Sequence, residues 1–144
     1  MSPALKFLIG LAAVLAQVWI SLGPLGNGAR FIDAAERRAR QVVAETEVPG
    51  ITVALDRSPL RRVATLQGPA DAFQRRGQGS LKGITQRVEE VQGIAAVQWA
   101  DEPPTRRFVL PLVVESMIPA LIAYLLGLAL GWRLWRRRET GRYS

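Results

Sequence analysis

Glu115 is the residue of this chain whose type and position most suggest chemistry. It is the only charged residue in an apolar stretch of 25 residues that runs from Phe108 to Trp132. A carboxylate within a membrane-spanning segment is costly to keep there and is therefore a candidate functional group. Three interpretations stay open: a proton relay, a contact with a partner protein, or a position at headgroup depth beside Arg106 and Arg107. We expect a contact with a partner protein or with lipid.

Arginine is the other residue type that could bind a ligand. Arg106 and Arg107 immediately precede the second apolar stretch, so they should lie near lipid headgroups. Four of the five arginines that follow that stretch lie close to its end: Arg133, Arg136, Arg137 and Arg138. We expect both groups to contact anionic phospholipids or a partner protein. Nucleic acid is not an expected partner, because the chain has no basic motif interleaved with aromatic residues.

The sequence lacks the side chains on which most enzyme chemistry depends. It contains no Cys and no His, which excludes thiolate nucleophiles, imidazole bases and metal sites built from either residue. Neither a nucleophile-elbow motif nor a phosphate-binding loop is present. The adjacent acids Glu89-Glu90 and Asp101-Glu102 diverge on a regular helix or strand, which suits acid–base pairing poorly. We therefore expect no catalysis, no cofactor and no metal.

Two apolar stretches indicate a membrane protein. Of the 144 residues, 49% are hydrophobic, which excludes a wholly disordered chain. Residues 7–25 carry no charge, and crossing a hydrocarbon core takes roughly 20 helical residues. We predict transmembrane helices at residues 1–25 and 105–132. A cleaved signal peptide is the alternative for the first, because residues 13–16 resemble a small-residue cleavage site, although the apolar character continues beyond them.

The charges beside these stretches predict the topology. The tail, residues 133–144, has five arginines and one glutamate, and such a tail stays cytoplasmic by the positive-inside rule. Loops longer than about 60 residues cross the membrane largely regardless of charge. We therefore predict a two-pass protein of a bacterial inner membrane, with both termini cytoplasmic and an external, periplasmic domain at residues 26–104. The inverted topology is the alternative.

Small residues in the second stretch form a row that suits helix packing. Ala123, Gly127 and Gly131 follow at four-residue spacing and so share one face of a helix. Such a row lets another helix approach closely. The partner is either the first stretch, through residues such as Gly10 and Ala13, or another subunit. Ordinary lipid-facing composition is the remaining interpretation.

The middle region alternates between helical and extended patterns. Apolar spacing predicts a helix at residues 31–47, and alternation predicts a strand pair at residues 51–55 and 62–67. We then expect a short helix at residues 70–76 with Phe73 packed inward. A longer helix should begin near Ser80 as its N-cap and run to Val91, and a last strand should occupy residues 94–99. The fold class is therefore α+β, in the order α-β-β-α-β, flanked by two transmembrane helices.

Three segments of this region carry a family resemblance: Ile51–Leu55, Val63–Gly68 and Val88–Val97. With the element order, they resemble a BON domain, a small module named from bacterial osmotic-shock and nodulation proteins. The resemblance covers about half of the chain. It implies phospholipid or partner binding without catalysis. The chain departs from the family pattern in the segment from Gly68 to Gly93, and this segment is long and broken by glycines.

Together these features predict a non-catalytic accessory or scaffolding subunit. It would bind a larger membrane protein complex through its helices and its external domain. Nothing in the residues selects among respiratory, photosynthetic, transport and envelope assemblies. The alternative is a stand-alone membrane protein of the BON type that binds phospholipid or the cell envelope.

Overall fold

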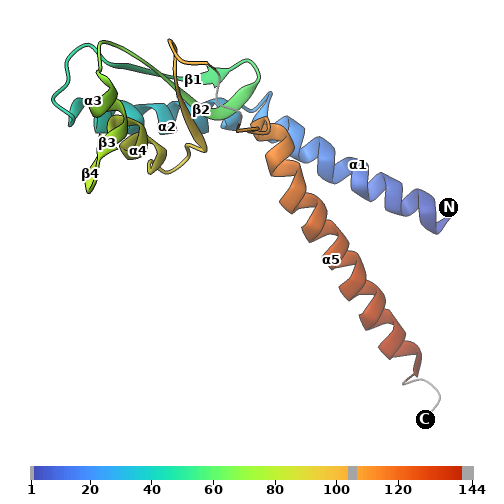
Figure 1. Cartoon of the computed structure of the whole chain (residues 1–144). Helices are drawn as coiled ribbons and strands as arrows, with labels where there is room; N and C mark the ends of the chain where they lie inside the picture. Colours follow the sequence, from blue (N-terminus) through green and yellow to red (C-terminus); the bar gives the residue numbers. More distant parts are fainter. Residues whose placement is uncertain (1, 104–106, 141–144) are drawn as a thin grey trace.

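Two long helices extend from the same end of a small α+β domain (Figure 1). The computed structural model describes residues 2–103 and 107–140, with side chains described through Arg133. Helix α1 spans Pro3–Leu22 and helix α5 spans Leu112–Thr140. Both helices are long and apolar enough to cross a membrane, over Pro3–Leu22 and Leu112–Arg133. Only 0% and 6% of their most apolar windows are buried within the molecule, so neither is the core helix of the domain.

The domain between them is built from one long helix, one sheet and a short helical segment. Its elements in chain order are α2 (Asn27–Ala44), β1 (Thr52–Arg57), β2 (Leu60–Gln67), α3 (Ala72–Arg76), β3 (Gly77–Gln78), β4 (Leu81–Lys82), α4 (Ile84–Glu89) and β5 (Ala96–Trp99). The predicted α+β class and the flanking apolar helices are therefore confirmed. The predicted helix at residues 31–47 begins earlier, at Asn27, where a short turn connects it to α1.

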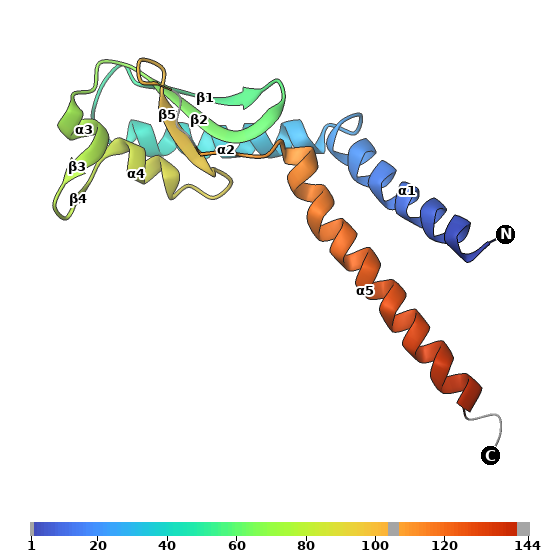
Figure 2. The same cartoon turned by 45° about the vertical axis from the view of Figure 1, so that its right-hand side comes forward.

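The main sheet has three strands in the order β1-β2-β5. Strands β1 and β2 form the predicted antiparallel hairpin, with Val53 opposite Leu66. Strand β5 pairs with β2 in parallel, with Leu66 opposite Trp99, so α3 and α4 make the crossover that a parallel pair requires. Strand β2 is thus the central strand, and its end near the β1–β2 turn lies where the two long helices meet the domain (Figure 2).

The core forms where α2 packs on one face of this sheet. Ile32, Ala35 and Ala39 are each 0% exposed and follow one helical stripe. On the sheet, alternate residues face them, and these include Val53, Leu55, Ala64, Leu66, Val97 and Trp99. The alanines let the helix lie close to the sheet, and the larger β-branched and leucine side chains fill the remaining space.

The segment between β2 and α4 differs from the prediction. Phe73 is 51% exposed and not packed inward, and α3, on which it lies, is only 5 residues long. Ser80 is not an N-cap: Gly83 takes that position, and α4 begins at Ile84. Residues 77–82 instead form a tight β3–β4 hairpin. Gly77 has φ +73°, and a Cβ there would lie 2.0 Å from the carbonyl oxygen of Leu81, so this close approach requires glycine.

Candidate functional site

The junction of the two long helices with the domain contains a pocket of about 450 Å³, which we call the junction pocket. Four elements line it, and the residues are Leu22, Asn27, Phe31, Arg62, Leu112, Glu115, Ser116 and Pro119. Half of these side chains are apolar, and the charged ones are a single arginine and a single glutamate. The site therefore combines an apolar wall with one pair of opposite charges.

Arg62 and Glu115 form a bidentate ion pair in this pocket. Nε of Arg62 donates to Oε2 of Glu115 at 2.9 Å, and Nη2 donates to Oε1. Arg62 lies two and four positions before the core residues Ala64 and Leu66 on β2. Alternate residues of a strand share one face of the sheet, so Arg62 points to the face on which α5 begins. Glu115 lies one turn into α5, where it meets this guanidinium. The pair joins the central strand of the domain to the second apolar helix.

Arg107, one of the two cations expected beside Glu115 from the sequence, lies elsewhere. Arg107 donates from Nη1 to Oε1 of Glu89 at 3.1 Å, and Arg106 lies outside the described residues. The partner of Glu115 is separated from it by 53 positions in the chain. No local pattern marks such a pair. The only available signal was Arg62 itself, an arginine placed in register with buried residues of a strand.

Apolar contacts also hold both helices to the domain. Leu112 at the start of α5 is 7% exposed and belongs to the domain core, and Leu22 at the end of α1 packs against that core. A Cβ on Gly28 would lie 2.6 Å from the carbonyl oxygen of Leu22, so α2 starts in close contact with the end of α1. These contacts attach the two helix ends to the domain without a long linker.

The two long helices contact each other through Tyr124, a residue that the sequence analysis did not single out. Its hydroxyl donates to the carbonyl oxygen of Phe7 at 2.8 Å, and the two rings lie 5.7 Å apart between centroids. A Cβ on Gly10 would lie 2.5 Å from the hydroxyl oxygen of Tyr124. Gly10 therefore makes room for an aromatic side chain, whereas the sequence suggested that it meets the small residues of the second stretch.

The small-residue row on α5 is open. No described atom lies within 4 Å of a Cβ placed on Gly127 or on Gly131, and Ala123 is exposed. Helix α1 therefore does not cover this row within the described structure. Packing of another subunit on the row stays a prediction.

The basic residues divide into paired and exposed groups. In the domain, Glu36 is 6% exposed and accepts hydrogen bonds from Arg40, from Arg57 at 3.0 Å and from the backbone N–H of Leu55 at 3.3 Å. This network satisfies one backbone group on the outer edge of β1. After the second span, Arg133 is exposed. Arg136, Arg137 and Arg138 continue helix α5, and their side chains lie outside the described ones.

A second charged cluster holds the exit from β5. Arg75 makes a bidentate pair with Asp101, at 2.9 and 2.7 Å, and its guanidinium lies 4.1 Å from the ring centroid of Trp99. The hydrogen bond from Arg75 lowers the pKa of the Asp101 carboxyl below its usual value. The pKa of Arg75 is raised by the same hydrogen bond. Similarly, the hydrogen bond to Asp33 raises the pKa of Arg57. Arg75 and Arg57 therefore stabilise the domain through ion pairs within it.

Within residues 2–103 and 107–140, no group of three or more His, Cys, Asp or Glu side chains could hold a metal ion. Comparisons of the chain with protein-family models, with curated proteins and with solved structures found no match. The resemblance to the BON domain therefore stays a prediction. The candidate site stands on its own geometry: a charged pair in an apolar pocket, where two apolar helices join an α+β domain.

Proposed function

We propose that this chain is a non-catalytic accessory subunit that docks on a larger integral membrane protein complex. The observation that carries the proposal is the open small-residue row of α5. Apart from chain neighbours and the backbone of α5 itself, no described atom lies within 4 Å of a Cβ placed on Gly127 or Gly131, although such rows let helices pack closely in lipid. Helix α1 contacts α5 nearer the domain, at Tyr124. The part of α5 beyond Tyr124, farther from the domain, is thus available to a helix of another protein.

The attachment of the domain supports a scaffolding role. Leu112, the Arg62–Glu115 pair and the close approach at Gly28 hold the domain to both helix ends. A domain held in this way presents one fixed surface above the membrane. Simultaneous contact by the helices and by the domain raises the effective concentration of each, so that neither contact has to be strong alone.

We place the chain in a bacterial inner membrane with the domain in the periplasm and both termini in the cytoplasm. The basic run after the second span supports this orientation, by the positive-inside rule. The contacts of Phe7 and Gly10 with Tyr124 support a retained first helix, because cleavage after Ala16 would remove both.

The docking proposal is tested by native gel electrophoresis of the full chain, extracted in mild detergent from membranes of the source organism. We expect the wild type to migrate with a large complex, and the double variant Gly127→Ile/Gly131→Ile to migrate as a small species. Ala129→Ile is the matched control, since it adds the same bulk at about 200° around the helix from Gly127. A small wild-type species, or equal behaviour of the double variant and the control, would contradict docking on this row.

A stand-alone phospholipid-binding protein is the second candidate. It is supported by the continuation of α5 to Thr140, which carries the arginines at 133 and 136–138 beyond the apolar span on one helix. Under this alternative, the purified chain is a small species that binds vesicles containing anionic lipid. Its binding should weaken steeply as salt increases, because screening reduces attraction between exposed charges.

A further inference from the structure

The junction pocket lies at the boundary between the apolar helices and the domain. Leu22 ends α1 and Leu112 begins α5, and both line the pocket. Lipid headgroups occupy about 5–7 Å on each side of a hydrocarbon core that is about 30 Å thick. If the two helices cross a membrane, the pocket lies at headgroup depth. Its volume of about 450 Å³ is within the range of pockets that hold small ligands.

The charged pair in the pocket has unused hydrogen-bonding capacity. Arg62 binds Glu115 through Nε and Nη2, which leaves the donors of Nη1 outside the pair. Each carboxylate oxygen of Glu115 accepts one of these bonds and retains a second lone pair. The side chains are 28% and 36% exposed, so a ligand can reach both. The pocket therefore presents a cationic donor and an anionic acceptor next to each other.

We propose that the junction pocket binds a zwitterionic phospholipid whose headgroup carries a phosphate and a primary ammonium, as in phosphatidylethanolamine. The phosphate accepts hydrogen bonds from Nη1 of Arg62, and the ammonium donates to Glu115. The lipid tail lies along the apolar residues Leu22, Leu112 and Pro119.

Charge complementarity favours this headgroup over the other common ones. The pair is neutral overall, so an anionic headgroup would leave one negative charge without a counterion beside Glu115. A choline headgroup has no N–H to donate to the carboxylate. The neighbouring cation Arg57 is already paired with Asp33 at 2.7 Å. Arg61, the residue before Arg62 on β2, points to the opposite face of the sheet by strand alternation.

Native mass spectrometry of the full chain in detergent tests this site. The probes are phosphatidylethanolamine, phosphatidylcholine and phosphatidylglycerol with identical acyl chains. We expect one saturable phosphatidylethanolamine adduct, bound at least about tenfold tighter than the other two lipids, because only its primary ammonium can donate a charge-assisted hydrogen bond to Glu115. The double variant Arg62→Met/Glu115→Met should lose this preference. The control Arg107→Met/Glu89→Met removes an ion pair elsewhere and should keep it.

A third variant makes the test independent of the stability of the pair. Ser116→Phe leaves the Arg62–Glu115 pair in place and fills the pocket with an aromatic ring, so it should abolish the adduct. Equal binding of the three lipids by the wild type, a preference for phosphatidylglycerol, or no adduct would overturn the proposal. Retention of the preference by the folded double variant or by Ser116→Phe would overturn it too. Since none of these changes alters Gly127 or Gly131, the outcome is separate from docking.

Discussion

At the scale of the residue, the molecule uses arginine–carboxylate pairs to hold its parts together. Arg62 and Glu115 join β2 to α5, Arg75 and Asp101 hold the exit from β5, and Glu36 pairs with arginines between α2 and β1. The ion pairs of this chain differ in exposure, and so in what their loss costs. The Arg62 side chain is 28% exposed, whereas that of Arg107 in its pair with Glu89 is 63% exposed.

Arg62 and Glu115 in the junction pocket should therefore show a large coupling free energy in a double-mutant cycle. Arg62→Met leaves the carboxylate of Glu115 without its partner in a partly desolvated place and should lower the free energy of unfolding by about 1–3 kcal/mol. Arg62→Met/Glu115→Met should recover most of this loss, because no unpaired charge remains. Urea unfolding of the detergent-solubilised chain measures both in a double-mutant cycle. The same cycle at Arg107 and Glu89 should give a coupling below about 1 kcal/mol, and equal coupling in both cycles would count against the special position of Arg62.

The Arg75–Asp101 pair makes stability depend on pH at the acidic end. The pKa of Asp101 is lower in the folded chain than its usual value, with the hydrogen bond from Arg75 as the main cause. The ionised form is thus favoured by folding. The stabilisation is complete above the ordinary aspartate pKa of about 3.9 and is lost as the pH falls through the lower, folded pKa. Asp101→Asn should flatten this part of a plot of thermal midpoint against pH. An unchanged acid slope would argue that the pair does not form in solution.

At the scale of the element, the connections are set by glycines as much as by apolar periodicity. The β3–β4 hairpin depends on Gly77, whose Cβ position is occupied by backbone of the opposite strand. Gly79, at the tip of the same hairpin, also has a positive φ of +59° but has no atom within 4 Å of its Cβ position. Substitution of Gly79 should therefore cost only the strain of the left-handed backbone conformation, whereas substitution of Gly77 should also cost a steric clash.

Alanine substitution at these two positions gives different expected losses. Gly79→Ala should destabilise the chain by about 1 kcal/mol through its left-handed conformation alone. Gly77→Ala adds a clash with backbone and should cost a further 1–3 kcal/mol or so. Thermal unfolding of both variants, followed by circular dichroism, measures the difference. Equal losses would mean that the hairpin does not have the close approach described above.

The sequence correctly predicted the elements whose apolar residues follow one regular spacing, either that of a strand or that of a helix. Alternation at residues 51–55 and 62–67 corresponds to the β1–β2 hairpin, and the apolar spacing at residues 31–47 corresponds to α2, whose buried face includes Ala35 and Ala39. The predicted helix from Ser80 was wrong in its first turn, because the pairing of residues 77–78 with 81–82 overrides the apolar spacing of Leu81. The junction pocket could not be predicted, since Arg62 and Glu115 meet only after the sheet and α5 have packed.

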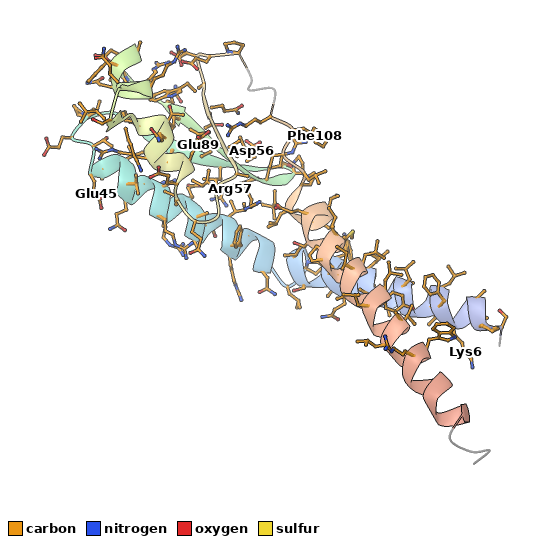
Figure 3. The ribbon with its side chains drawn as sticks, turned by 60° about the horizontal axis from the view of Figure 1, so that its bottom comes forward. Lys6, Glu45, Asp56, Arg57, Glu89 and Phe108 are labelled. Carbon is orange, nitrogen blue, oxygen red and sulfur yellow. The ribbon has the colours of Figure 1, made fainter. Side chains whose placement is uncertain are left out.

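At the scale of the whole molecule, the arrangement of two apolar helices and one domain is compatible with a membrane protein of two passes. Both helices leave the same end of the domain, with Lys6 near the far end of α1 and Glu45 at the end of the domain away from the helices (Figure 3). Arg133 lies at the far end of the second apolar span. The junction pocket and the open row on α5 acquire their proposed roles only in this arrangement, with lipid around the helices.

The most direct test of this arrangement is the sidedness of single cysteines, which the cysteine-free chain allows without background. A membrane-impermeant maleimide is applied to intact spheroplasts that express either Glu45→Cys or Ser2→Cys, and then to lysed ones. We predict that Glu45→Cys is labelled in intact spheroplasts and that Ser2→Cys is labelled only after lysis. Labelling of Ser2→Cys before lysis with Glu45→Cys protected would reverse the topology, and labelling of both before lysis would contradict the two-pass arrangement.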